Sequence, residues 1–399
     1  MSTTPSPSPL VRALFVALVA LGVLGAAEVA GRVGYAILDH ARAGNIRGRT
    51  WFNSYERPDP EHPGNWLLRP GLTLTLADTR KLAEADGLVL AEQALDRGAA
   101  RLAIPEDRVV FRTNAEGYKG PPLDRSGTRP RVLAIGDSCT FGSLLEYYTW
   151  PRSAERALAA DGVPAEVVNA GVNGYSPINA VVRLDEFRAL HPSVAVIYIG
   201  WNALYGDRKT VEGSYYALQR LFVTLRTLWW EHGKTPQEVA LSFYNRPKHP
   251  DRDAPQIAQL ATYRPPFVAD VETLVRSLQE GGAEVWIATL PGLYQLDEAP
   301  SARALEFGHL PQWTDNPYVI AAMSKAYNER LRDLATRTHA GLVDLEQWSR
   351  TALVPRDRFF IDSVHLTEEG QEQIGIEVAR VIARSLDGSA SRAGASAAR

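Results

Sequence analysis

Short apolar runs separated by helical periods dominate the chain from Arg131 onward. The runs are apolar throughout rather than alternating, and amphipathic stretches such as Met323, Tyr327, Leu331 and Leu334 follow them. Strands that are buried on both faces and joined by helices form a parallel sheet. The pattern therefore predicts a three-layer α/β/α doubly wound domain over residues 131–386. Its expected strands are Val132–Ile135, Glu166–Asn169, Val194–Ile199, Glu284–Leu290 and Gly341–Leu345.

Residues 39–130 predict a connector followed by a small β-rich preamble. Four prolines between Pro58 and Pro70 exclude a helix there. Apolar residues then alternate with polar ones around Leu72–Leu76 and Val109–Thr113, as in half-buried strands, and Leu82–Ala100 between them has a helical composition. Beyond the α/β domain, residues 387–399 are rich in Ser, Ala and Gly, which predicts a disordered tail.

The N-terminal segment, residues 1–38, predicts membrane targeting. Ala13–Ala27 carries no charge, and the apolar stretch continues past Glu28 and Arg32 if those two lie at the interface, which favours an uncleaved anchor with the α/β domain outside the cytoplasm. Cleavage near Ala27, which would release a secreted protein, is the alternative. More arginines follow the apolar run than precede it, and by the positive-inside rule this distribution argues against export of the residues that follow. A helix of a soluble core fits less well, because no polar stripe interrupts the run.

Composition narrows the partners and the chemistry. The 399 residues include 43 Lys+Arg and 46 Asp+Glu, for a net charge of −3, so no basic excess exists to neutralise phosphates and nucleic acid is not an expected partner. The single cysteine, Cys139, excludes an internal disulfide and a cysteine-based metal site. We interpret Cys139 as a small buried residue.

Candidate chemistry lies where the predicted strands end. GDSCTFG, residues 136–142, follows the first strand, and its Ser138 is either a helix cap or a nucleophile. The motif is not the Gly-x-Ser-x-Gly elbow, because Thr140 stands two positions after Ser138. Ligands of doubly wound sheets bind at this edge, beyond the carboxyl ends of the strands.

Three further segments follow later strands. Asn169–Ser176 contains Gly171 and Gly174, which serve a turn or let a backbone N–H approach a ligand. Asn202, in Gly200-Trp201-Asn202, either caps the next helix or presents its amide to an oxyanion. Asp362 and His365 stand three apart before the last predicted helix, so the carboxylate can orient the imidazole and leave its other nitrogen for a nucleophile.

Together, in this order, these segments resemble the SGNH or GDSL hydrolase superfamily over roughly Arg131–Leu386. The matching letters are Ser138 in GDSCTFG, Gly174 in NAGVNGYS, Asn202 in GWNA and His365 in DSVHL. Trp150-Pro151 and the Thr113–Gly120 stretch look like the membrane-anchored, extracytoplasmic branch of that superfamily. One departure is Ala203, where the family commonly has aspartate; that aspartate is outside the catalytic set.

The resemblance implies a serine esterase with Ser138 as nucleophile, His365 as base and Asp362 as its orienting acid. The oxyanion would be held by the N–H groups of Ser138 and Gly174 and by the Asn202 side chain. Such an enzyme needs no metal and no organic cofactor. The expected substrate is a short-chain ester, O-acetyl above all, on a cell-envelope carbohydrate or a small molecule. The alternatives are an O-acyltransferase of exported glycans that uses the same site, and a non-catalytic binding or scaffold protein.

The segment 203–264 interrupts the domain between Asn202 and the next predicted helix. It holds aromatic residues at several positions, among them Tyr215, Phe222, Trp229 and Phe243. We interpret it as a packed surface subdomain, with a lid or sugar-binding wall over the site as the alternative. Leu293–Asn316, after the fourth predicted strand, is a candidate for another wall.

Overall fold

The computed structural model describes residues 8–42, 52–207, 246–311 and 313–397, together with residues 217, 221, 222, 225, 229 and 232–234. The chain divides into two compact units. One comprises Met1–Asn45 with Lys209–Lys234, and the other comprises Ile46–Arg208 with Thr235–Arg399. Each unit is described by itself below.

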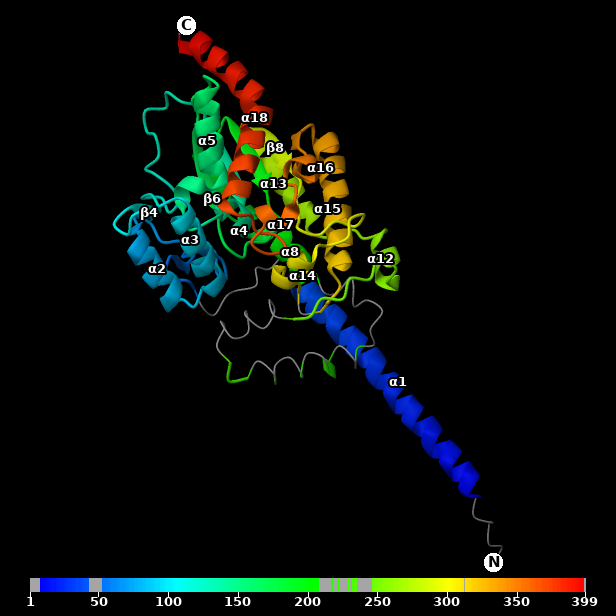
Figure 1. The fold of residues 1–399 in the computed structure, drawn as a ribbon. Coiled ribbons are helices and arrows are strands. Elements are labelled where there is room, and N and C mark those ends of the chain that lie inside the picture. Colours follow the sequence, from blue (N-terminus) through cyan, green and yellow to red (C-terminus); the bar gives the residue numbers. More distant parts are fainter. Residues whose placement is uncertain are drawn as a thin grey trace, which may run out of the picture. The chain divides into compact units, whose positions relative to one another are not determined.

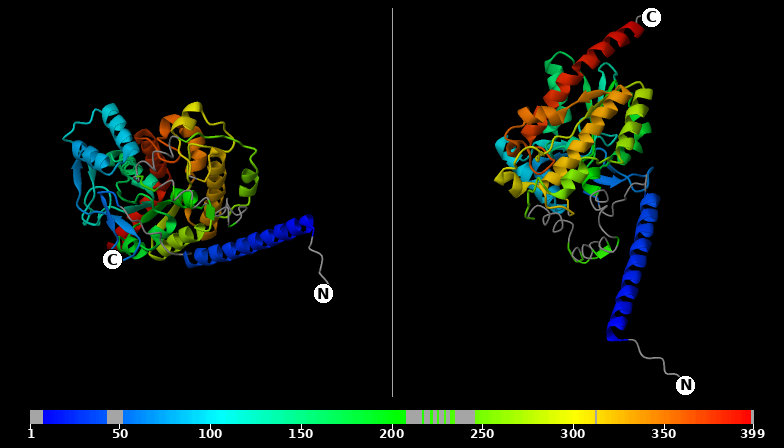
Figure 2. Two further views of the ribbon diagram at one scale, coloured as in Figure 1. Left: turned by 90° about the horizontal axis from the view of Figure 1, so that it is seen from below. Right: turned by 90° about the vertical axis from the view of Figure 1, so that its right-hand side faces the viewer.

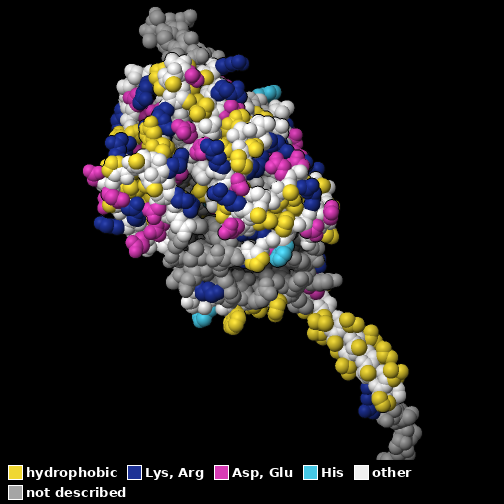
Figure 3. All heavy atoms as spheres, viewed as in Figure 1, with side chains coloured by type: hydrophobic (Ala, Val, Ile, Leu, Met, Phe, Trp, Pro, Cys, Tyr) yellow, Lys and Arg dark blue, Asp and Glu magenta, His cyan; other side chains and the backbone are white. Residues whose placement is uncertain are grey.

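The first unit contains α1 (Pro9–Arg42), which Figures 1 and 2 show as one unbroken helix. Its window Pro9–Gly34 has 26 residues with a mean hydropathy of 2.3, and none of that window is buried. At a rise of 1.5 Å per residue the window is about 39 Å long, more than the hydrocarbon core of a bilayer. Hydrophobic side chains cover it in Figure 3. A helix of this length and composition fits a membrane anchor or a signal sequence.

The second unit is built on five parallel strands in the order β6-β5-β7-β8-β9. The strands are β5 (Arg131–Gly136), β6 (Glu166–Gly171), β7 (Val194–Tyr198), β8 (Glu284–Ala288) and β9 (Gly341–Val343). Their central residues, such as Leu133 and Val196, are fully buried. All five strands were predicted from the apolar runs, and the order that reverses at β5 confirms the doubly wound fold.

Helices cover both faces of this sheet (Figure 1). α5 (Trp150–Ala160) packs against α18 (Glu368–Ala397) on one face. On the other face, α13 (Val268–Glu280) contacts α6 (Pro177–Val181), α7 (Leu184–Ala189) and α15 (Pro317–Thr338). The apolar positions predicted for α15 are all buried. Further helices of the second unit's described residues are η1 (Glu146–Tyr148), α8 (Trp201–Gly206), α12 (Pro255–Leu260), α14 (Ala302–Phe307), α16 (Leu345–Ala352) and α17 (Arg356–Phe359).

The preamble belongs to the same compact unit as the sheet. It contains two antiparallel pairs, β1 (Glu56–Pro58) with β2 (Trp66–Leu68) and β3 (Thr73–Thr75) with β4 (Val109–Arg112). Lys119 then bridges to Asn169 of β6 in antiparallel fashion, with its N–H donating to the Asn169 carbonyl at 3.2 Å. β6 is an end strand of the parallel sheet, so this contact covers an edge that would otherwise be open.

The structure adds detail to two predictions for the preamble and contradicts the one for the tail. The helical structure expected over Leu82–Ala100 is confirmed: it consists of α2 (Leu76–Ala85) and α3 (Val89–Arg101), with Gly87 at φ +66° between them. The proline-rich connector contains the β1-β2 hairpin, whose Trp66 is buried. The expected disordered tail is helical as far as Ala397, since its alanines continue the helix begun at Glu368.

About half of the segment 203–264 lies outside the described residues. Its described parts include α8, which begins at Trp201, and α12, which packs against α15. The lid or sugar-binding wall therefore stays a prediction.

Candidate active site

The nucleophile turn begins where β5 ends. Gly136 is followed by α4 (Ser138–Phe141), and the N-cap of α4 is Asp137, whose carboxylate accepts the Cys139 N–H at 2.9 Å. Ser138 is therefore the first residue of the helix and not its cap. The interpretation of Ser138 as a helix cap is wrong. A side chain at Gly136 would collide with Thr140 and with the Tyr198 carbonyl. Glycine is required there because neighbouring backbone approaches so closely.

Ser138, His365 and Asp362 form one hydrogen-bonded chain. The Ser138 Oγ lies 2.7 Å from His365 Nε2, and His365 Nδ1 lies 2.6 Å from Asp362 Oδ2. The other oxygen of Asp362 accepts the N–H groups of Val364 and His365, each at 2.8 Å. The carboxylate is thus held by its own loop while it holds the imidazole. This is the geometry that lets an imidazole take a proton from a serine hydroxyl.

The electrostatics of the pair favour a protonated imidazole. Burial would raise the pKa of Asp362, but the charges of His365 and His309 and the hydrogen bonds from His365 outweigh it and hold that pKa well below its usual range. Burial would lower the pKa of His365, but the adjacent Asp362 outweighs it, so the pKa of His365 is raised. An imidazolium formed during proton transfer is therefore stabilised by a carboxylate that stays ionised.

Three hydrogen-bond donors, the N–H groups of Ser138 and Gly174 and the Asn202 amide, follow strands that end next to one another in the sheet. Gly136 pairs with Gly171 on one side and with Tyr198 on the other, so the segments carrying Ser138, Gly174 and Asn202 leave the sheet at one edge. Within the described residues, the N–H groups of Ser138 and Gly174 donate to no acceptor. The Asn202 Nδ2 donates to the Tyr175 carbonyl at 3.0 Å and has a second N–H to offer.

Asn202 is not the cap of its helix either. The N-cap of α8 is Gly200, at φ +148°, and a side chain there would collide with the ring of Tyr327. The alternative that Asn202 serves as a helix cap is therefore wrong, and its amide is held by Tyr175 instead.

Asp137 has a structural role that the sequence alone did not reveal. Besides the Cys139 N–H, its buried carboxylate accepts the N–H groups of Gly200 and Trp201, each at 3.2 Å. One side chain therefore joins the turn that carries Ser138 to the turn that carries Asn202. Burial raises the pKa of Asp137. In the sequence, only the position of Asp137 between Gly136 and Ser138 in the GDS motif pointed to this residue.

His309 is a second imidazole beside Asp362. Its Nδ1 lies 3.7 Å from Asp362 Oδ2, and burial lowers its pKa. Its carbonyl accepts the hydroxyls of Ser363 and Tyr205, the latter at 3.1 Å. His309 lies within Leu293–Asn316, the segment expected to form a wall, but nothing in the local sequence relates it to Asp362, more than 50 residues later.

Lys119 of the preamble reaches the end of the nucleophile helix. Its ammonium is buried, donates to the carbonyls of Phe141 at 3.0 Å and Ser143 at 2.5 Å, and lies 3.7 Å from the centre of the Phe141 ring. Burial lowers its pKa to about 7. The preamble therefore supports the turn that carries Ser138.

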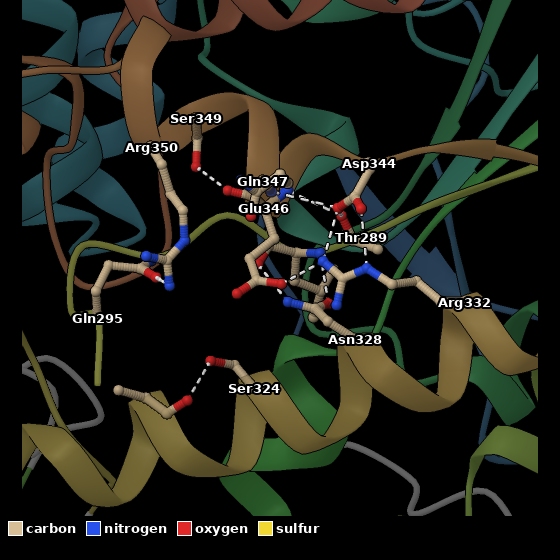
Figure 4. A network of polar contacts seen from close by, with 12 residues as sticks. Thr289, Gln295, Ser324, Asn328, Arg332, Asp344, Glu346, Gln347, Ser349 and Arg350 are labelled. Carbon is tan, nitrogen blue, oxygen red and sulfur yellow. Dashed lines mark hydrogen bonds and ion pairs between the residues drawn. The ribbon is translucent and has the colours of Figure 1, made fainter. Parts of the chain in front are cut away.

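A polar network joins α15 to the residues that follow β8 and β9 (Figure 4). Arg332 of α15 bonds Asp344 at 2.8 Å and Glu346 at 2.5 Å, and the Thr289 hydroxyl donates to Asp344 at 2.9 Å. On the same helix, the Asn328 side chain pairs with the backbone of Leu290 through two hydrogen bonds. These contacts fix the start of the segment that leads from β8 to His309.

The Cys139 thiol does not take part in the hydrogen-bonded chain from Ser138 through His365 to Asp362. The thiol is buried, lies 3.5 Å from the Val364 carbonyl, and has a pKa raised by burial. Among the described residues, no cluster of three or more His, Cys, Asp or Glu side chains is arranged to hold a metal ion.

A doubly wound parallel sheet with a serine, an imidazole and a carboxylate joined at its carboxyl edge defines the class of α/β serine hydrolases. The model of the GDSL-like lipase/acylhydrolase family matches residues 134–373, and the chain belongs to that family. Among curated proteins, none matches the chain.

Solved structures of low sequence identity resemble the chain. The match to a lipase/acylhydrolase from Enterococcus faecalis has 17% sequence identity and a TM-score of 0.37. It covers 64% of this chain and 95% of that protein's chain. The acetyl xylan esterase AlAXEase is 17% identical with a TM-score of 0.39, covering 63% and 99%. A catalytic mutant of Axe2, an acetylxylan esterase from Geobacillus stearothermophilus, is 16% identical with a TM-score of 0.38, covering 63% and 94%.

Proposed function

We propose that this member of the family is a serine esterase whose nucleophile is Ser138. The observation that carries the proposal is the unbroken chain from the Ser138 hydroxyl through His365 to Asp362, with contacts of 2.7 and 2.6 Å. The sequence motifs indicated the same three residues, and the fold brings them together from two segments more than 220 positions apart.

In the acylation step, the Ser138 Oγ attacks the ester carbonyl carbon while His365 Nε2 takes the hydroxyl proton. The carbonyl π electrons move to oxygen, and the resulting oxyanion accepts hydrogen bonds from the N–H groups of Ser138 and Gly174 and from Asn202. Collapse of this intermediate breaks the bond to the alcohol oxygen. His365 returns its proton to that oxygen, so the alcohol leaves and an acyl-Ser138 ester remains.

In the deacylation step, water attacks the acyl carbon of that ester and His365 takes a proton from the water. The second oxyanion collapses, the Ser138 oxygen leaves and is reprotonated by His365, and a carboxylic acid is released. Asp362 stays ionised throughout, because its pKa is held low. A sugar hydroxyl in place of water would make the same site an O-acyltransferase.

We propose short-chain esters, such as O-acetyl groups of cell-envelope carbohydrates or small molecules, as substrates. We also propose that α1 stays in the membrane and that the catalytic unit lies outside the cytoplasm. The length and apolar surface of α1 support the first part, since 26 residues of mean hydropathy 2.3 are enough to span.

Labelling with a fluorophosphonate tests the nucleophile. We expect the wild-type protein to be labelled and Ser138→Ala to remain unlabelled, with equal thermal stability as the control for folding. Labelling of Ser138→Ala would contradict the assignment, and an unlabelled, folded wild-type protein would favour a binding protein.

Turnover of 4-nitrophenyl acetate, butyrate and octanoate then tests the acyl group. We expect the acetate to have the highest kcat/KM. Adding an oligosaccharide acceptor separates the two reactions, because hydrolysis yields only acid whereas transfer yields an acylated sugar detected by mass. A preference for octanoate would contradict the short-chain assignment.

A further inference from the structure

The β1-β2 hairpin of the preamble contacts the turn that carries Gly174. The Trp66 indole N–H donates to the Asn173 carbonyl at 3.0 Å, and the Tyr175 hydroxyl donates to the Trp66 carbonyl. The rings of Trp66 and Tyr175 meet edge to face, with their centroids 5.3 Å apart, and both side chains are buried. Hydrogen bonds in such surroundings are stronger than those in water.

The carbonyl that Trp66 contacts belongs to the same peptide unit as the Gly174 N–H. A trans peptide is planar, so its C=O and N–H point in opposite directions. A donor on the Asn173 carbonyl therefore fixes the direction of the Gly174 N–H, which donates to no acceptor within the described residues. A carbonyl that accepts a hydrogen bond also polarises its peptide, which makes the N–H a stronger donor.

The turn by itself leaves that direction open. The Tyr175 N–H donates to the Val172 carbonyl at 3.3 Å. Gly174 has φ +79° and Asn173 has no positive φ, the pattern of the two central residues of a type II turn. In a type I turn the central peptide faces the other way, and glycine readily adopts the φ of about −90° that a type I turn requires. The bond from Trp66 favours the type II form, because it forms only while the Asn173 carbonyl points at the hairpin.

Tyr55, directly before the hairpin, makes a second contact with this turn. The Asn173 side-chain amide donates to the Tyr55 hydroxyl at 2.7 Å, and the Tyr55 ring stacks on Phe141 of α4 with the centroids 5.5 Å apart. The preamble therefore connects the turn after β6 to the nucleophile helix. It lies outside residues 134–373, which match the family model, so these contacts come from a part of the chain beyond the family domain.

We propose that Trp66 is a positioning residue for ester hydrolysis at Ser138. Its indole N–H keeps the peptide between Asn173 and Gly174 turned so that the Gly174 N–H meets the oxyanion. Trp66 acts through this peptide and not on the substrate. The role rests on the proposed serine-esterase function, and it gives the preamble a part in stabilising the transition state.

Two replacements of Trp66 test this role in the full chain. Trp66→Phe removes the indole N–H together with part of the ring. Incorporation of benzothienylalanine at the same position replaces the N–H by sulfur and keeps the bicyclic ring, so that the packing is preserved. Asn65→Ala is the matched control, because the Asn65 side chain contacts Asn179 of α6 at 3.2 Å and leaves the Asn173 carbonyl untouched. Urea unfolding measures the stability of each protein.

We expect both replacements of Trp66 to lower kcat for 4-nitrophenyl acetate about 10- to 100-fold, because a misdirected oxyanion donor is felt in the transition state. KM should change little. The inhibition constant of a trifluoromethyl ketone, whose adduct with Ser138 places an oxyanion at the same site, should rise by the same factor. Asn65→Ala should keep kcat and this inhibition constant within a few-fold of the wild type, even where its stability falls.

Unchanged kcat and inhibition constant in both replacements of Trp66 would overturn the positioning role, while ester turnover by the wild type would leave the esterase function standing. A loss in Trp66→Phe alone would assign the effect to the ring instead of the N–H, and equal losses in Asn65→Ala would assign it to the whole hairpin. Either result overturns the role of the indole N–H. A wild-type protein that neither turns over the ester nor binds the ketone would refute the esterase function and the positioning role together.

Discussion

The two sides of the catalytic edge are built differently. On one side, the turns after β5, β6 and β7 carry Ser138, Gly174 and Asn202 within four residues of a strand end. On the other side, Asp362, His365 and His309 come from long segments held by contacts across the fold, such as the Leu293 N–H to the Ser363 carbonyl at 2.9 Å. The difference indicates that the positions of Ser138, Gly174 and Asn202 depend on local turns, whereas the contact between Ser138 and His365 depends on tertiary packing.

Removing the contact between the two sides is expected to have the largest effect. Ser138→Ala and His365→Ala should each lower kcat about 10⁶-fold, and the double variant should lose no more than either single one, because the two residues act as a unit. Kinetics of 4-nitrophenyl acetate turnover for the three variants measure this. Additive losses in the double variant would show that the two sides act independently.

Asp362→Asn should lower kcat about 10⁴-fold, because an amide favours the wrong imidazole tautomer. Wild-type activity needs His365 in its neutral form. Because Asp362 raises the pKa of His365, activity should fall as the pH drops through this raised pKa, which lies above the ordinary value of a histidine. Without the carboxylate that pKa is lower, so the acid limb of kcat/KM should move to lower pH. An acid limb that stays in place would exclude Asp362 as the cause of the raised pKa.

On the side of the local turns, Asn202→Ala should lower kcat by about 10² to 10³, the usual effect of losing one oxyanion donor. KM should change little, since the interaction forms in the transition state. Ala203→Asp, which restores the residue common in the family, is the matched control on the same helix and should change kcat far less. Equal losses in both variants would point to disruption of α8 rather than to the Asn202 amide.

Asp137→Asn tests whether the local turns are independent of each other. Its carboxylate accepts three N–H groups from the Ser138 and Asn202 turns, and an amide offers one oxygen instead of two. We expect a loss of about 1–3 kcal/mol in the free energy of unfolding and a fall in kcat of up to about 10²-fold from misplaced donors. Urea unfolding and steady-state kinetics measure the two effects. A change in stability with unchanged kcat would limit Asp137 to a structural role.

His309→Gln should have the smallest effect, with kcat within a few-fold of the wild type. Burial lowers the pKa of His309, so the unfolded chain binds a proton at this position more readily than the folded one. The wild-type protein should therefore lose stability as pH falls below about 6.5, the ordinary histidine value. Urea unfolding at pH 7.5 and pH 5.0 should show a smaller loss for His309→Gln. An identical loss in both proteins would mean that His309 is not held neutral by the fold.

Several elements could be predicted because they depend on short stretches of sequence. The five strands are continuous apolar runs, and such runs are typical of a parallel sheet that is buried on both faces. The order of the motifs then placed Ser138, Gly174 and Asn202 at one edge, as the register shows. Local turn geometry was harder to predict. Asp137 and not Ser138 caps α4, and the break at Gly87 between α2 and α3 is not visible in the composition of Leu82–Ala100.

The sequence by itself determined the sheet, the apolar helix at the N-terminus and the residue types that a serine hydrolase needs, because strand burial and turn chemistry are encoded within a few neighbouring residues. Only the tertiary structure decided that Asp137 joins two turns, that Lys119 of the preamble supports the nucleophile helix, and that His309 lies 3.7 Å from Asp362. Each of these contacts joins segments more than 20 positions apart. Their geometry depends on how the whole unit packs, which no local pattern records.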